Sequence, residues 1–121
     1  MDWHFTDDRP IWVQLTEQLT LRILKGEYPP GGKLPAVREI AAQAGVNPNT
    51  MQRAMAQLEQ DGLAVANRTA GRTVTEDAAV IQAARRARAS AAVADCLQIL
   101  EDLGYARADA FVLLKEELDH E

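Results

Sequence analysis

The chain has 121 residues, the length of one compact domain with at most a small appendage. It carries 13 basic and 18 acidic side chains, a formal net charge of −5, which excludes a broadly basic DNA-packaging protein. A single cysteine, Cys96, excludes an intramolecular disulfide framework and a multi-cysteine metal site. No apolar run approaches the ~20 residues of a membrane-spanning helix, and the acidic start does not resemble a secretory signal. We therefore expect a cytoplasmic protein with no membrane partner, no metal and no cofactor.

Charge is distributed unevenly along the sequence. Residues 1–75 hold eight basic and eight acidic side chains, whereas residues 76–121 hold five basic and ten acidic ones. Within residues 33–72 there are five basic and three acidic side chains. A small local patch in this segment could therefore meet a polyanion such as DNA.

The first half of the chain shows three helical patterns. Pro10 suits the first position of a helix whose apolar residues repeat at helical spacing until Gly26, and 28–32 is rich in turn residues. A second helix is predicted over 36–44, with Gly45 in a left-handed cap. Asn47 then predicts an N-cap with proline at the next position, opening a third helix that ends at 61–62.

Two short extended pieces are predicted next, at 63–66 and 73–75, joined by a basic hairpin loop over 67–72. Nothing interrupts a helix from 76 to 103, and a final helix is predicted over 108–118. The expected fold class is mainly α with one small β-hairpin.

The second and third predicted helices, joined by a tight turn at Gly45, have the makings of a helix-turn-helix. In such a motif the second helix presents its first turn to the major groove, so that turn must be small, polar and positively polarised. Met51 and Met55 have helical spacing suited to a buried face. The polar residues expected at DNA from this helix are Asn47, Asn49, Thr50, Gln52 and Arg53.

The sequence resembles the GntR family of bacterial transcription regulators, and its tail resembles the short YtrA-like branch. The motifs that carry the resemblance are Pro10-Ile11-Trp12, Leu24-Lys25-Gly26-Glu27, Pro30-Gly31, Leu34-Pro35-Ala36-Val37-Arg38-Glu39, Gly45-Val46-Asn47-Pro48-Asn49-Thr50 and Leu58-Glu59-Gln60-Asp61-Gly62-Leu63. They run through residues 10–75 in the family's order and spacing.

The resemblance implies a winged helix-turn-helix that binds a double-stranded operator and regulates transcription, most simply as a repressor. Arg38 would reach a base edge or a phosphate, and Arg68, Gly71 and Arg72 would form the wing. The sequence departs from the family's pattern twice. Many relatives have arginine where this chain has Gln52, so that Arg53 would carry part of that role, and Thr69 replaces a wing glycine.

The tail over 76–121 is predicted to be the dimerisation unit, and 1–75 the DNA-binding domain. A two-helix hairpin cannot cover apolar side chains on so many sides, whereas a second copy would complete a four-helix arrangement. The expected dimerisation residues are Ile81, Ala84, Ala91, Leu97, Leu100, Leu103, Phe111, Leu114 and Leu118.

Simpler interpretations exist for several of these residues. Asn47 is explained by its cap alone, and Arg38 by an ion pair with Glu39 or Asp61. Trp12 is expected to anchor a core or an interface.

The alternative function is a helical dimerisation or scaffold module without specific DNA binding. An enzyme is disfavoured because no nucleophile, base or pair of acids has a supporting partner. The operator, and the existence of a small-molecule effector, are left open.

Overall fold

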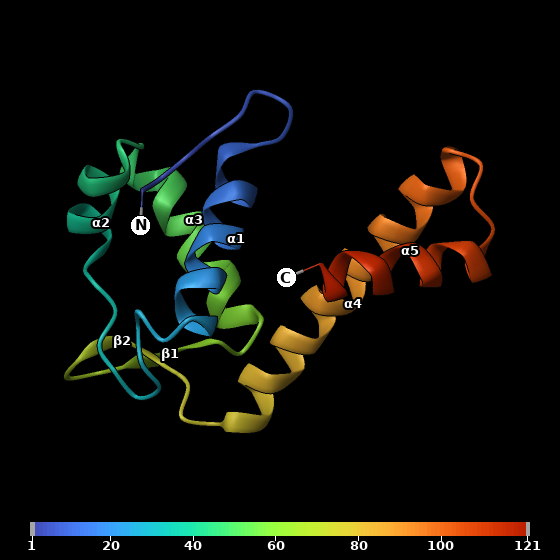
Figure 1. Cartoon of the computed structure of the whole chain (residues 1–121). Coiled ribbons are helices and arrows are strands. Elements are labelled where there is room, and N and C mark those ends of the chain that lie inside the picture. The colour runs from blue at the N-terminus through green and yellow to red at the C-terminus, as the bar shows by residue number, and fades with distance from the viewer. Residues whose placement is uncertain (1, 121) are drawn as a thin grey trace. The chain divides into compact units, whose positions relative to one another are not determined.

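A computed structural model describes residues 2–120 and has five helices and one two-stranded antiparallel sheet over that range (Figure 1). The elements in chain order are α1 (Ile11–Leu24), α2 (Val37–Ala44), α3 (Pro48–Gln60), β1 (Ala64–Asn67), β2 (Gly71–Val74), α4 (Ala78–Asp102) and α5 (Arg107–Asp119). The predicted fold class is confirmed. The chain divides into two compact units, unit 1 up to Ala84 and unit 2 from Arg85, and the division falls inside α4.

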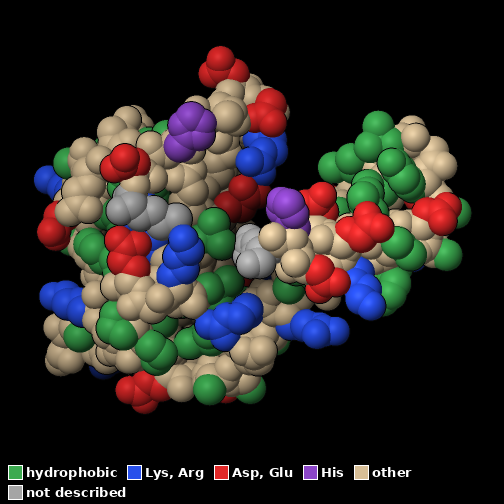
Figure 2. Space-filling view, viewed as in Figure 1, with side chains coloured by type: hydrophobic (Ala, Val, Ile, Leu, Met, Phe, Trp, Pro, Cys, Tyr) green, Lys and Arg blue, Asp and Glu red, His purple; other side chains and the backbone are tan. Residues whose placement is uncertain are grey.

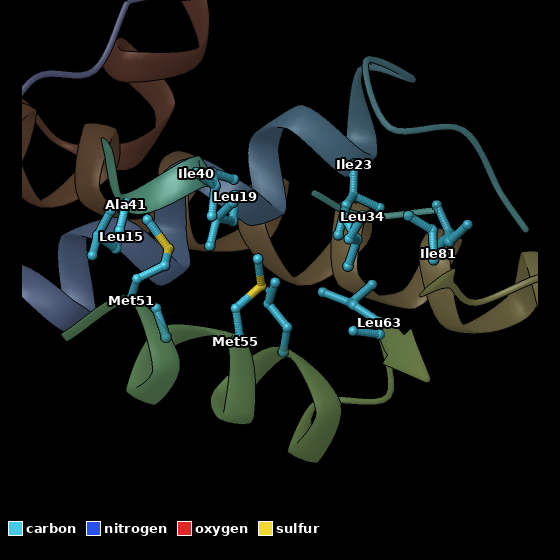
Figure 3. Packing of buried hydrophobic residues seen from close by; sticks show 14 residues of the cluster. Leu15, Leu19, Ile23, Leu34, Ile40, Ala41, Met51, Met55, Leu63 and Ile81 are labelled. Carbon is cyan, nitrogen blue, oxygen red and sulfur yellow. The ribbon is translucent and has the colours of Figure 1, made fainter. Parts of the chain in front are cut away.

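The core of unit 1 lies between α1, α2 and α3 (Figure 3). The helices α1 and α3 pack side by side. The methionines Met51 and Met55 of α3 are fully buried among aliphatic side chains of the other two helices. The remaining labelled core residues of these helices are Leu15, Leu19, Ile23, Ile40 and Ala41. The predicted inward face of the third helix is therefore confirmed.

The hairpin is tied to the start of α2 by the segment between α1 and α2. In the hairpin Ala64 pairs with Val74, and Asn67 with Gly71. On the other side of β2, the Leu34 N–H donates to the Arg72 carbonyl at 2.9 Å, and Val74 exchanges similar bonds with 31–32. The hairpin is thus held on two sides, and its position is coupled to the helix that follows Leu34.

The strands differ by one or two residues from the predicted ones because of the side chain of Asn67. Its Oδ1 accepts hydrogen bonds from the N–H groups of Thr69 and Ala70, at 3.0 and 3.2 Å. This closes a short turn, so β1 runs on to Asn67 and pairs at once with Gly71, whose φ is +76°. The predicted six-residue loop is therefore shorter.

The chain before α1 is fastened to that helix by two glutamine side chains. The Thr6 N–H donates to Gln14 Oε1 at 2.8 Å, and the His4 N–H donates to Gln18 Oε1 at 3.1 Å. Both side-chain amides donate back to carbonyls of the segment. Trp3 stacks on the guanidinium of Arg22, 3.8 Å from ring centroid to Cζ, and packs against the core.

The first turns of α4 belong to unit 1. The helix starts at Ala78, two residues later than predicted, because Asp77 Oδ1 accepts from the Ala79 N–H as a cap. Ile81 is only 7% exposed and lies near Leu63 in the core (Figure 3), while Ala84 packs against that core in part. This corrects one prediction: Ile81 completes its own chain's core and is not available to a dimer interface.

Unit 2 contains the rest of α4 and the whole of α5. Gly104, with φ +100°, turns the chain between them, and α5 extends the predicted 108–118 by one residue at each end. Among residues 85–120, which the structure describes throughout, Ala110 alone is buried. Large apolar side chains are exposed instead, and Figure 2 shows apolar side chains gathered over the end of α4 and the start of α5. This unit has little core of its own.

Candidate nucleic-acid interface

The turn between α2 and α3 has the geometry of a helix-turn-helix. Gly45 adopts a left-handed conformation with φ +71°, and the Val46 N–H donates to the Ala41 carbonyl at 3.0 Å. Asn47 caps α3, its Oδ1 accepting from the Asn49 N–H at 2.7 Å, and Pro48 occupies the first helical position. The predicted caps are confirmed. Because Asn47 Oδ1 is used in the cap, its amide NH₂ is the part of the side chain left to donate elsewhere.

The N-terminal half of α3 carries three exposed polar side chains, those of Asn49, Gln52 and Arg53. Their spacing of three and four residues puts them on one face of the helix, opposite the buried methionines. Thr50 is half-buried at the edge of this face. The positive end of the helix dipole lies at the same end of α3, which favours an anionic partner there.

Arg53 does not extend freely into solvent. Its Cζ lies over the ring of Trp12, the second residue of α1, at 4.1 Å from the ring centroid. Sequence reasoning predicted each residue separately and missed the contact, because no sequence spacing relates the start of α1 to the middle of α3. Trp12 is half-buried, and its predicted role as an anchor of a core or an interface stays a prediction.

Arg38 is exposed in the first turn of α2. Within residues 2–120 it forms no ion pair with Glu39 or Asp61, and Asp61 instead accepts a hydrogen bond from Gln57 at 2.9 Å. The simpler interpretation, an arginine held by an internal ion pair, is therefore not supported. Its charge is available to a partner molecule.

The two arginines of the hairpin differ in their surroundings. Arg68 is exposed in the turn, whereas Arg72 Nε lies 2.5 Å from Glu59 Oε1 of α3. The Arg72 side chain is 21% exposed and that of Glu59 34%. Gly71 is exposed, and nothing lies within 4 Å of where a Cβ would stand, so a surface could approach its backbone closely. The sequence did not predict Glu59 as the partner of Arg72.

A concavity of about 480 Å³ lies between the hairpin and the start of α2. Its lining includes both members of the Arg72–Glu59 pair, together with Lys33 and Asn67. Basic side chains on the visible face of unit 1 are interspersed with acidic ones (Figure 2).

Residues 2–120 contain no group of three or more potential metal-ligating side chains, and no helix among them is long and apolar enough to cross a membrane.

Residues 13–74 match the gntR family of bacterial regulatory proteins. The chain belongs to this family. It is 40% identical over 81 residues to the HTH-type transcriptional regulator YhcF of Bacillus subtilis, a match that covers 67% of each chain. It is 41% identical over 69 residues to the HTH-type transcriptional repressor YtrA of the same organism, covering 57% of this chain and 53% of YtrA.

A GntR family transcriptional regulator from Listeria monocytogenes has the same fold, with a TM-score of 0.85 and 31% identity over 93% of this chain and 98% of the other. The predicted family and its YtrA-like branch are confirmed. In this chain α2, α3 and the β1–β2 hairpin form the winged helix-turn-helix of the family. The helix α3 is the recognition helix of this fold, and the hairpin is its wing. The chain is a transcription regulator with a DNA-binding fold.

Proposed function

We propose that the chain is a repressor that binds a pseudo-palindromic operator as a homodimer, with each α3 in one major groove and each wing beside it. The observation that carries the proposal is the exposed polar face of Asn49, Gln52 and Arg53 at the N-terminal half of a capped helix. YtrA, a relative at 41% identity, is itself named a repressor. The regulator would act in the cytoplasm, without a cofactor and without enzymatic activity.

The polar face divides into residues that read sequence and residues that hold the backbone. Asparagine and glutamine pair with adenine edges, so Asn49 and Gln52 are assigned to bases. Arg38 reaches a base edge or an adjacent phosphate. The residues assigned to positioning on the backbone are Asn47, Thr50, Arg68, Gly71 and Arg72.

The second copy is proposed to cover the apolar surface of unit 2. Phe111 is 69% exposed and Leu118 79%, exposures that are unfavourable for side chains of this size in a monomer. A two-fold partner would bury them in a four-helix arrangement. The other assigned residues are Ala91, Leu97, Leu100, Leu103 and Leu114, with Ala84 at the border of unit 1. The recognition helices would then stand about 34–36 Å apart, or a multiple of that spacing.

Selection of bound duplexes from a random library, followed by footprinting, tests the function directly. We expect a pseudo-palindromic sequence with two protected half-sites about one helical turn apart. A chain that dimerises but selects no sequence would overturn the proposal in favour of the alternative, a dimerisation or scaffold module.

A further inference from the structure

The stack of Arg53 on Trp12 joins the recognition helix to the start of α1. Arg53 is exposed, and its guanidinium lies over the half-buried indole with Cζ 4.1 Å from the ring centroid. A stacked guanidinium keeps its N–H donors in the plane of the group, directed away from the ring. The stack therefore restrains the side chain and leaves its donors available.

The indole is attached to a firmly held part of α1. Trp12 lies in the first turn of α1, and its carbonyl accepts from Thr16 Oγ1 at 2.7 Å. One turn further on, Leu15 is fully buried in the core between α1 and α3. The backbone that carries the ring is thus fixed beside the recognition helix, and the half-buried ring lies against Arg53.

The direction of the stack separates Arg53 from its two polar neighbours on α3. Arg53 leans toward Trp12 of α1, whereas Asn49 and Gln52 are the other exposed polar residues in the N-terminal half of α3. A donor at the side of a helix that lies in a groove meets the phosphates bordering that groove, and a planar guanidinium binds phosphate in a bidentate manner.

We infer that Trp12 is a positioning residue, which holds the Arg53 guanidinium for contact with an operator phosphate. The inference rests on the proposed function, since it requires α3 to enter the groove. An unrestrained arginine loses rotamer freedom when it binds. The stack with Trp12 removes part of that loss before DNA arrives, so it contributes to affinity without touching DNA.

A double-mutant cycle tests the inference, with the duplex selected by the wild-type chain as the probe. The variants are Trp12→Leu, Arg53→Gln and the two combined, measured in the full chain at several salt concentrations. We expect Trp12→Leu to weaken operator binding about three- to tenfold, with two stacks per dimer. In the Arg53→Gln background the same change should have less than about a twofold effect.

Arg53→Gln alone should weaken specific and random duplexes by similar factors. It should also flatten the slope of log K against log salt by about 0.9 for each phosphate that the variant no longer neutralises. Trp12→Phe retains a ring face and should restore most of the affinity that Trp12→Leu removes. If Trp12→Leu is too unstable to measure, the comparison of Trp12→Phe with wild type, in both Arg53 backgrounds, gives the same cycle with a smaller effect.

The chain offers a matched control in its other tryptophan–arginine stack. Trp3 stacks on Arg22, whose side chain is 4% exposed and paired with Glu27 at 3.0 Å. Trp3→Leu should lower the melting temperature but leave operator affinity and its salt dependence unchanged in the folded protein.

Three outcomes would overturn the inference. They are an equal effect of Trp12→Leu with and without Arg53, no effect of Trp12→Leu on affinity, and no effect of Arg53→Gln on affinity. Arg38→Ala distinguishes these from a failure of the proposed function. If Arg38→Ala weakens operator binding while the Arg53 and Trp12 variants do not, the function stands and the positioning role is wrong.

Discussion

Arg72 of the wing and Glu59 of the recognition helix form an ion pair, with Nε 2.5 Å from Oε1. The pair joins β2 to the last turn of α3 and occupies one edge of the guanidinium. Because the Nε edge faces Glu59, the remaining donors of Arg72 are those that can meet DNA. Glu59 also offsets the charge of Arg72, which lowers the attraction of the wing for any phosphate.

Glu59→Gln is therefore expected to bind random duplexes more tightly than wild type, with a steeper salt dependence, because Arg72 becomes available to phosphates. The pair is partly exposed, so its loss should cost no more than about 1 kcal/mol of unfolding free energy. Binding to random duplexes across a salt series measures the first effect. Asp61→Asn is the matched control, since it changes the charge equally two residues away without touching Arg72. Unchanged non-specific affinity in Glu59→Gln would show that Glu59 does not restrain Arg72.

Arg38 and Arg68 are both exposed, but the proposed function gives them different roles. Arg38→Ala should cost about 1–3 kcal/mol on the selected operator and relax its sequence preference. Arg68→Ala should weaken all duplexes evenly and reduce the salt slope by about 0.9 for each phosphate left without its cation. Titrations of specific and random duplexes separate the two patterns. Operator affinity that survives Arg38→Ala unchanged would remove Arg38 from the interface.

Asn47 has a structural role in the cap and a proposed role at DNA, and two substitutions separate them. Asn47→Asp keeps the oxygen that accepts from the Asn49 N–H, so stability should be retained, while the added negative charge should weaken binding to DNA. Asn47→Ala should lose about 1 kcal/mol of stability. Thermal unfolding and operator titration are measured on both variants. Normal DNA affinity in Asn47→Asp would limit this residue to its cap.

The local features of this chain could be predicted from sequence because their signals are local. Gly45 in a left-handed cap and Asn47 as an N-cap depend on side chains within a few residues, and the structure has both where they are predicted. The contacts that shape the interface could not be predicted in this way. The Trp12–Arg53 stack and the Arg72–Glu59 pair join different elements, and only the packed core determines which side chains meet.

The tail shows the same distinction. An uninterrupted helical pattern predicts α4, but the pattern does not reveal where along the helix one compact unit ends and the next begins. The apolar character of Ile81 predicts a dimer interface, whereas the structure places this residue in the core beside Leu63. Apolar spacing identifies a buried face without identifying what buries it.

A fragment ending at Ala84 should therefore be more stable than one ending at Thr75. The shorter fragment lacks Ile81, and removal of a large core side chain costs about 2–5 kcal/mol. Chemical denaturation of the two fragments measures the difference, and Ile81→Ala in the longer fragment should reproduce most of it. Equal stability of the two fragments would show that α4 contributes nothing to the core of unit 1.

The exposed apolar side chains of unit 2 lead to the last prediction. Phe111→Glu and Leu118→Glu place a charge where the second copy is proposed to pack, and burial of an unpaired charge is strongly unfavourable. Either change should shift sedimentation of the full chain from dimer to monomer at micromolar concentration. Operator affinity should then fall steeply, since a monomer engages one half-site only.

Lys115→Glu, an exposed charge reversal on the same helix, is the control for added negative charge. A wild-type chain that sediments as a monomer, or a Phe111→Glu chain that remains a dimer with full operator affinity, would contradict the assignment of this surface to the second copy.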